Sequence, residues 1–200
     1  MGISAEDVKK LRDQTGAGMM DCKAALGESG GDFAKAVEVL RKKGISTAAK
    51  KAGRTASEGV IASYIHPGAK VGVLVEVNCE TDFVARTKEF QEFSHDIAVQ
   101  IAAMDPKFRT REEVPEALLN KEREILYAQL ETSGKPDNIK KQIVDGRLEK
   151  WYGENVFPDQ AFIKDDSIKI HQLITNHIAK FGENIVIRRY TRFKLGEIAE

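Results

Sequence analysis

The sequence has little cysteine and no long apolar run. Its 200 residues include two cysteines, Cys22 and Cys79, without a CxxC motif, and we expect both to be reduced thiols of a cytoplasmic protein. No apolar segment approaches the roughly 20 residues that span a bilayer, so we expect no membrane association. The opening residues, MGISAEDVKK, are polar and charged, so we also expect no signal peptide.

A net charge is absent as well. The 31 Lys and Arg residues balance the 31 Asp and Glu residues, whereas a protein that binds nucleic acid usually carries a basic excess. The global composition therefore predicts no direct contact with nucleic acid. A hydrophobic fraction of 42% with 31% charged residues is typical of a soluble globular protein, and the length fits one or two domains.

Motifs for catalysis and for metal binding are also missing. The four histidines show no HExxH or other metal-binding spacing, and GESGGD lacks the Lys-Ser/Thr ending of a phosphate-binding loop. Cys22 lies among small and apolar residues, which favours a buried position over a reactive one. These absences favour a binding protein without catalytic residues, metal or cofactor over an enzyme.

Three short helices are predicted in residues 1–43. Ser4 is expected to cap the first, and Gly16 and Gly18 are expected to bracket the turn after it. The second helix covers MMDCKAAL. The third has apolar residues at the i, i+3, i+4 and i+7 positions, and we expect it to end at Gly44. Helices this short bury only a small core, so the unit is predicted to be a docking module attached to something larger.

Residues 44–58 are predicted to be a basic linker, which can be partly helical. The segment is rich in small, hydroxyl and basic residues and has almost no apolar bulk. A contact with RNA or with an acidic protein surface is an alternative, but a solvated linker is favoured.

An α+β core domain is predicted over residues 59–200. VIASYI and VGVLVEVNC form a hairpin, in which alternate residues of the second strand, from Val71 to Cys79, share one face. NIVIRRYTRFKL adds a third antiparallel strand, with Ile185, Ile187 and Phe193 on one face. Helices are expected to cover one face of this three-stranded sheet, and the other face can stay solvated or meet a partner.

The helices of this domain are predicted from their apolar stripes. One covers residues 82–104 and buries a stripe that ends at Met104. A helical hairpin is expected at about 112–152, with an apolar stripe formed by Leu118, Ile125, Leu126, Ile139 and Ile143. QAFIKDD then forms a connector. Ser167 is expected to cap a last helix that ends at Gly182.

The turn NCETDFVARTKEF, residues 78–90, carries an aromatic ring at an acidic position. Thr81 can cap the following helix, and Asp82 in its first turn suits the helix dipole. Phe83 precedes Phe90 by seven residues, within about 20° of the same helix face. Periodicity therefore favours a buried Phe83, and leaves open a ring that is held out for a partner.

Three segments carry a family resemblance. LRDQTGAGMMDCKAAL at 11–26, TDFVAR at 81–86 and, more weakly, QAFIKDDSI at 160–168 resemble signatures of bacterial elongation factor Ts. The resemblance covers essentially the whole chain. It implies a cytoplasmic guanine-nucleotide exchange factor for elongation factor Tu that performs no covalent chemistry, and a ubiquitin-associated-like fold for the three-helix module.

The resemblance also implies two contact sites for elongation factor Tu. One is an apolar docking surface for the GTP-binding domain, formed by Leu11, Met19 and Met20. We expect at least one of these side chains to fill the helical core instead. The other is a wedge that enters beside the nucleotide site, disturbs the elements that hold magnesium and releases GDP, and it is formed by Thr81, Asp82, Phe83 and Val84.

Longer members of the family carry a second half of the core, which this chain lacks. The resemblance therefore implies the short form, a homodimer whose contact involves the free faces of the sheet. Two alternatives rank behind the exchange factor. One is an RNA-binding translation protein that uses the basic linker together with Arg188 and Arg192. The other is an enzyme that depends on Cys22.

Overall fold

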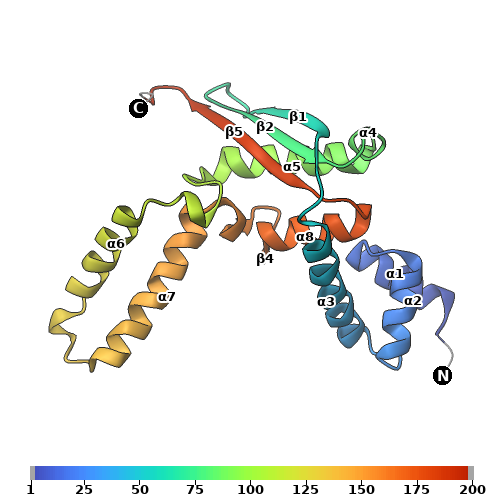
Figure 1. The fold of residues 1–200 in the computed structure, drawn as a ribbon, viewed down its shortest axis with the longest axis horizontal. Coiled ribbons are helices and arrows are strands. Elements are labelled where there is room, and N and C mark those ends of the chain that lie inside the picture. Colours follow the sequence, from blue (N-terminus) through green and yellow to red (C-terminus); the bar gives the residue numbers. More distant parts are fainter. Residues whose placement is uncertain (1–2, 198–200) are drawn as a thin grey trace. The chain divides into compact units, whose positions relative to one another are not determined.

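The computed structural model describes residues 3–197, so residues 1–2 and 198–200 at the ends of the predicted domains lie outside it. Its elements, drawn in Figure 1, run in the order α1 (Ala5–Thr15), α2 (Met19–Glu28), α3 (Phe33–Lys51), β1 (Glu58–Ile65), β2 (Val71–Cys79), α4 (Asp82–Ala85), α5 (Lys88–Met104), η1 (Arg111–Glu113), α6 (Glu116–Ala128), η2 (Glu131–Ser133), α7 (Asp137–Asn155), η3 (Phe157–Asp159), β3 (Ala161–Phe162), β4 (Asp165–Lys169), α8 (Ile170–Phe181) and β5 (Val186–Lys194).

The chain divides into two compact units. The first consists of Met1–Ser63, Leu74–Asp96 and Gln172–Thr191, and the second of Tyr64–Val73, Ile97–His171 and Arg192–Glu200. The first unit therefore holds α1 to α4 and most of α8, whereas the second holds α6, α7 and the short strands β3 and β4. The mixture of helices and an antiparallel sheet confirms the predicted α+β class.

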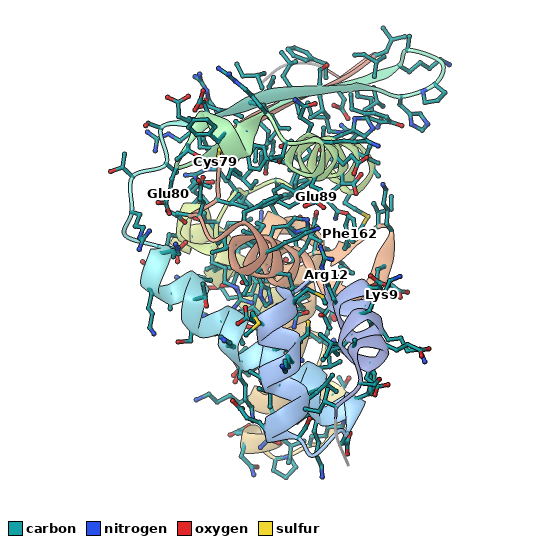
Figure 2. The ribbon with its side chains drawn as sticks, turned by 90° about the vertical axis from the view of Figure 1, so that its right-hand side faces the viewer. Lys9, Arg12, Cys79, Glu80, Glu89 and Phe162 are labelled. Atoms are coloured by element: carbon teal, nitrogen blue, oxygen red, sulfur yellow. The ribbon has the colours of Figure 1, made fainter. Side chains whose placement is uncertain are left out.

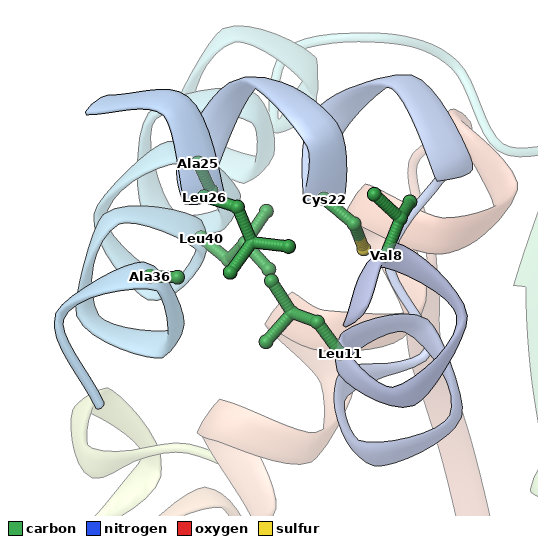
Figure 3. Close-up of a cluster of buried hydrophobic side chains, with 7 residues drawn as sticks. All are labelled: Val8, Leu11, Cys22, Ala25, Leu26, Ala36 and Leu40. Carbon is green, nitrogen blue, oxygen red and sulfur yellow. The ribbon is translucent and has the colours of Figure 1, made fainter. Parts of the chain in front are cut away.

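The first three helices pack around a small apolar core. Figure 3 shows its buried side chains, which come from all three helices: Val8, Leu11, Cys22, Ala25, Leu26, Ala36 and Leu40. The Ser4 hydroxyl caps α1 by accepting a hydrogen bond from the Asp7 amide at 3.0 Å. Gly16 ends α1 with φ 68°, as the sequence predicts.

The third helix does not end at Gly44, and that prediction was wrong. Helix α3 continues to Lys51, so it includes half of the segment predicted to be a linker. A glycine inside a helix costs about 1 kcal/mol relative to alanine. Here Gly44 is buried, and a β-carbon at this position would lie 3.6 Å from the Ala179 methyl group. This is an ordinary van der Waals distance, so the available space does not require a glycine here. The helix continues because packing of this buried position against α8 outweighs the modest cost of the glycine.

The three-stranded sheet has the order β1-β2-β5, so the C-terminal strand lies beside β2. The alternation predicted for β2 is confirmed, because Val73, Val75, Val77 and Cys79 are all buried. The pattern predicted for β5 holds only at its start. Ile187 is buried, but the alternation is broken by the exposed pair Arg188 and Arg189, and Phe193 is 70% exposed.

Helices α6 and α7 lie side by side as a helical hairpin (Figure 1). Their contact buries Leu126, Leu130 and Val144, with Ile143 packed against them. The predicted apolar stripe is only partly correct. Leu118, Ile125 and Ile139 are exposed, because the facing surface of each helix is narrower than the stripe in the sequence.

The segment predicted to be a connector forms a two-stranded sheet, β3 with β4. Ser167 lies in β4 and does not cap a helix. Its amide and hydroxyl both donate to the Asp165 carboxylate, and α8 begins at Ile170. Gln160 is fully buried beside this sheet. Its side-chain amide donates to the carbonyl groups of Met104 and Glu154, so it links three segments of the second unit.

Residue His177 of α8 should make stability depend on pH. Its ring stacks on Phe93 at 4.2 Å between centroids, its Nδ1 lies 2.8 Å from the Leu173 carbonyl oxygen, and burial lowers its pKa below the ordinary 6.5. The unfolded chain therefore binds a proton first on acidification, so stability is complete above this value and falls below it.

We expect His177→Phe, which keeps a ring against Phe93, to flatten the loss of stability between about pH 7 and 5. Urea unfolding of both proteins across this range measures the effect. The exposed His66, replaced in the same way, serves as the control. Parallel curves for wild type and His177→Phe would contradict this assignment.

Candidate partner-binding site

The turn that carries Phe83 is a single helical turn, α4, which follows directly on strand β2. Thr81 has extended dihedral angles and caps α4, since its Oγ1 accepts a hydrogen bond from the Val84 amide at 3.4 Å. Asp82 in the first turn pairs with Arg86 at 2.9 Å. Ala85 is buried and anchors the turn from below. The sequence prediction of a Thr81 cap is confirmed.

Phe83 is 81% exposed, so its predicted place in a buried stripe was wrong. The prediction assumed one continuous helix over residues 82–104. The helix is interrupted at Arg86 and Thr87, and a new cap begins α5, where Thr87 Oγ1 accepts from the Phe90 amide at 3.2 Å. This break removes the phase relation between Phe83 and Phe90, so only Phe90 enters the core.

Two loops exchange hydrogen bonds at the base of α4. From the connection between α8 and β5, the Glu183 carboxylate accepts from the Glu80 amide at 3.0 Å, from the Thr81 amide at 3.0 Å and from Thr81 Oγ1 at 2.6 Å. In return, the Glu80 carboxylate accepts from the Asn184 amide at 2.7 Å. We call Glu80, Thr81, Glu183 and Asn184 the junction cluster. Figure 2 labels Glu80 at the end of β2.

The junction cluster also holds the chain that leaves α3. The buried Asn184 side chain donates to the Arg54 carbonyl at 2.9 Å, and the Arg54 guanidinium lies 3.4 Å from the Glu80 carboxylate. The hydrogen bond from Asn184 and the neighbouring Arg54 lower the pKa of Glu80. Glu80 is therefore a structural carboxylate that stays ionised at neutral pH.

Cys79, labelled in Figure 2, is the last residue of β2 and is fully buried. Its thiol donates to the Thr81 carbonyl at 3.2 Å. Burial, with a further contribution from the negative charge of Glu183, raises the pKa of Cys79 to about 11. The group is thus an unreactive thiol as long as the turn stays closed above it.

The residues predicted for the docking surface do not all reach solvent. Met19 and Met20 form the first turn of α2, directly after the Gly16–Gly18 turn, and are 44% and 76% exposed. Leu11 is completely buried in the three-helix core. The expectation that at least one of the three side chains fills the helical core is therefore confirmed, and Leu11 presents no surface to a partner in this structure.

The structure favours neither alternative function. Burial raises the pKa of the Cys22 thiol and removes it from solvent, so it is a poor nucleophile. Arg192 is paired with Asp105 at 3.4 Å and with Glu197 at 3.3 Å, which leaves little free charge for RNA. Arg188 is exposed.

Within the described residues 3–197, no group of three or more His, Cys, Asp and Glu side chains could hold a metal ion. Over the same range, every helix is too short or too polar to cross a membrane.

Comparison with known proteins agrees with the sequence signatures. A sequence model described as elongation factor TS matches residues 34–197. The elongation factor Ts of Thermoanaerobacter sp. (strain X514) is 57% identical over 195 residues, which are 98% of this chain and 96% of that protein. The chain belongs to the elongation factor Ts family.

Elongation factors Ts from other bacteria are similar to this chain to about the same degree. That of Carboxydothermus hydrogenoformans is 57% identical over 98% of this chain and 90% of its own length. That of Anaeromyxobacter sp. (strain K) is 59% identical over 98% of this chain and 89% of its own length. The resemblance read from the three signatures is therefore confirmed at the level of the family.

Sequence reasoning on this elongation factor Ts family member missed Glu183 and Asn184. They follow Gly182, whose φ of 68° ends α8 and turns the chain toward β5. Nothing in the local pattern marks them, because their partners lie more than 100 residues away. The only available signal was that two polar residues stand between two apolar segments. This pattern is equally typical of an ordinary solvent-exposed turn.

The contrast between Leu11 and Met20 can be tested by stability. Leu11→Ala in the three-helix core should lower the free energy of unfolding by about 2–5 kcal/mol, because it leaves a cavity. Met20→Ala on the exposed first turn of α2 should change it by less than about 0.5 kcal/mol. Urea denaturation followed by circular dichroism measures both. Equal effects would show that the two side chains have similar surroundings.

Proposed function

We propose that the chain is a guanine-nucleotide exchange factor that binds elongation factor Tu with GDP and promotes GDP release in the elongation step of translation, in the cytoplasm. In this role the wedge of Thr81, Asp82, Phe83 and Val84 enters beside the nucleotide and magnesium site of the partner. No covalent chemistry takes place on the chain, and no cofactor is required.

The exposure of Phe83 is the observation that supports this proposal. A phenylalanine stabilises a protein by about 1.5–3 kcal/mol when it is fully buried, and Phe83, at 81% exposure, gives up most of that. The ring stands on a capped and anchored turn instead of a mobile loop. Aromatic side chains on rigid elements are the usual anchors of protein interfaces.

An exchange factor of this kind works by differential binding. The wedge must bind the conformation of elongation factor Tu with a weakened nucleotide site better than the conformation that holds GDP. By linkage, GDP then weakens the binding of this chain by the same factor that the chain weakens the binding of GDP. The reaction is therefore accelerated in both directions and needs no energy source.

The proposal gives the N-terminal helices a separate role. Residues 1–43 act as a ubiquitin-associated-like docking module, and Met19 and Met20 bind the GTP-binding domain of elongation factor Tu. Their exposure supports this role, and flexible, polarisable methionine side chains suit an adaptable contact. The docking surface supplies affinity, whereas the wedge supplies the change in the nucleotide site.

We expect Phe83→Ala to lower the maximum rate of GDP release from elongation factor Tu by about tenfold or more, the loss typical of a removed hot-spot side chain. Release of labelled GDP with magnesium present, at increasing concentrations of the exchange factor, gives the maximum rate and the half-saturating concentration. The half-saturating concentration should change little, because the docking surface is intact.

Two variants control this experiment. Tyr127→Ala removes another exposed aromatic ring, on α6, and should leave the rate unchanged. Met20→Ala should show the opposite pattern, a higher half-saturating concentration with the maximum rate preserved. If Phe83→Ala accelerates release as well as wild type does, the wedge has no role. If wild type itself has no effect, the exchange function is excluded.

We also propose that the chain is a homodimer, formed by the free face of its sheet. Ile61 of β1 and Leu74 of β2 lie on neighbouring strands and are 70% and 49% exposed. Such exposed apolar side chains on a regular sheet suit a contact between two copies. The short form of the family then completes its core with a second chain.

Light scattering tests the dimer. Wild type should have about twice the chain mass of 22.2 kDa, and Leu74→Glu should shift it toward the monomer, because the interface would bury an unpaired charge. Leu118→Glu on α6 introduces the same charge at another exposed leucine and should leave the mass unchanged. A monomeric wild type at micromolar concentration would contradict the proposal.

A further inference from the structure

The single turn of α4 is too short to be stable by itself. An isolated helix shorter than about 12 residues is marginal in water, because its first turn fixes several dihedral angles for few hydrogen bonds. Helix α4 has four residues. The orientation of the exposed Phe83 ring therefore depends on contacts that the turn makes with the rest of the first unit.

The turn lacks half of an ordinary capping box. In that motif the third helical residue is Glu or Gln, and its side chain returns to the amide of the capping residue. The third residue of α4 is Val84, which has no acceptor. Glu183 takes its place from the α8–β5 connection, since its carboxylate accepts from both the amide and the hydroxyl of Thr81.

These hydrogen bonds are of the strong kind. A carboxylate forms shorter and stronger hydrogen bonds than a neutral acceptor, and Thr81 Oγ1 lies 2.6 Å from Glu183 Oε1. The carboxylate is itself half-buried. The backbone beside Glu183 is held as well, because the amide of the following Asn184 donates to Glu80 and its side chain donates to the carbonyl of Arg54.

We propose that Glu183 is a positioning residue for nucleotide exchange, which supplies the missing half of the cap of α4 and thereby holds Phe83 in the orientation that enters elongation factor Tu. This inference rests on the proposed function. Glu183 does not contact the partner in this scheme. It acts through Thr81, because its hydrogen bonds restrict the turn to one orientation. The conformational entropy of the turn is then lost on folding and need not be lost on binding.

The first experiment compares the two kinetic parameters of GDP release. Glu183→Ala removes all three hydrogen bonds of the carboxylate, and we expect the maximum rate to fall about tenfold or more. The half-saturating concentration should change by less than about threefold, because the docking surface on α2 is unaffected. A variant that was merely less folded would show the opposite pattern, because a smaller active fraction raises the apparent half-saturating concentration and leaves the maximum rate unchanged.

A conservative variant tests the geometry. In Glu183→Gln the amide oxygen can still accept from both backbone amides, and the NH2 group can donate to Thr81 Oγ1. Its maximum rate should therefore lie between those of wild type and Glu183→Ala. Glu92→Ala and Glu92→Gln make the same changes at an exposed carboxylate of α5, which is paired with Lys88, and should leave the rate unchanged.

The buried thiol of Cys79 provides a second readout that needs no partner protein. It lies under the turn and donates to the Thr81 carbonyl. Opening of the turn exposes it, and loss of the Glu183 charge favours the thiolate. We therefore expect Cys79 to react about tenfold or more faster with a disulfide reagent in Glu183→Ala than in wild type, both carrying Cys22→Ala.

The two readouts separate the inference from the proposed function. If the rate of thiol modification and the maximum rate of release both stay within about twofold of wild type, Glu183 does not position the turn. A higher half-saturating concentration with an unchanged maximum rate and a lower unfolding midpoint would also overturn the inference, because it would show only a loss of folded protein. If wild type does not accelerate GDP release, the exchange function fails. Faster thiol modification in Glu183→Ala than in Glu183→Gln, which loses the same charge, would still show that Glu183 closes the turn.

Discussion

Hydrogen bonds between residues more than 100 positions apart hold the base of α4. They depend on the sheet. Because β5 lies beside β2 in the order β1-β2-β5, the loop that leads into β5 meets the loop that leaves β2. Each loop then accepts hydrogen bonds from the other, through Glu183 in one direction and Glu80 in the reverse. The sheet places the two loops together, and the junction cluster fixes the turn that displays Phe83.

Local signals made much of the fold predictable. The caps at Ser4 and Thr81 and the alternation of β2 are properties of short segments, and the structure has them as expected. The errors arose where a local pattern was used to predict a helix end or a helix length that tertiary packing or a second cap decides. Gly44 was taken to end α3, but packing against Ala179 keeps the helix intact. Thr87 is a possible helix cap in the sequence, but the apolar pattern of residues 82–104 was interpreted as one continuous helix, so the cap was not predicted.

Helix periodicity and family resemblance differed in how well they predicted the residues of the candidate site. For Leu11 the resemblance assigned a position in the docking surface, but the side chain is buried, as expected for at least one of the three docking candidates. For Phe83 the reverse holds, because periodicity indicated burial and the ring is exposed. Glu183 and Asn184 could not be found by either route. Their role depends on tertiary contacts, and no period or motif records them.

The two proposed contact sites differ in a way that fits the separate tasks proposed for them. Met19 and Met20 are unbranched side chains on the first turn of α2, and they can adapt to a partner surface at little cost. A wedge cannot adapt in this way. If Phe83 were free to move, it would follow the partner's existing conformation and would not favour another one, so no differential binding would result. In the proposed mechanism, rigidity at the base of α4 is therefore part of exchange itself, and the half-buried Glu183 carboxylate from a distant loop is an effective means to provide it.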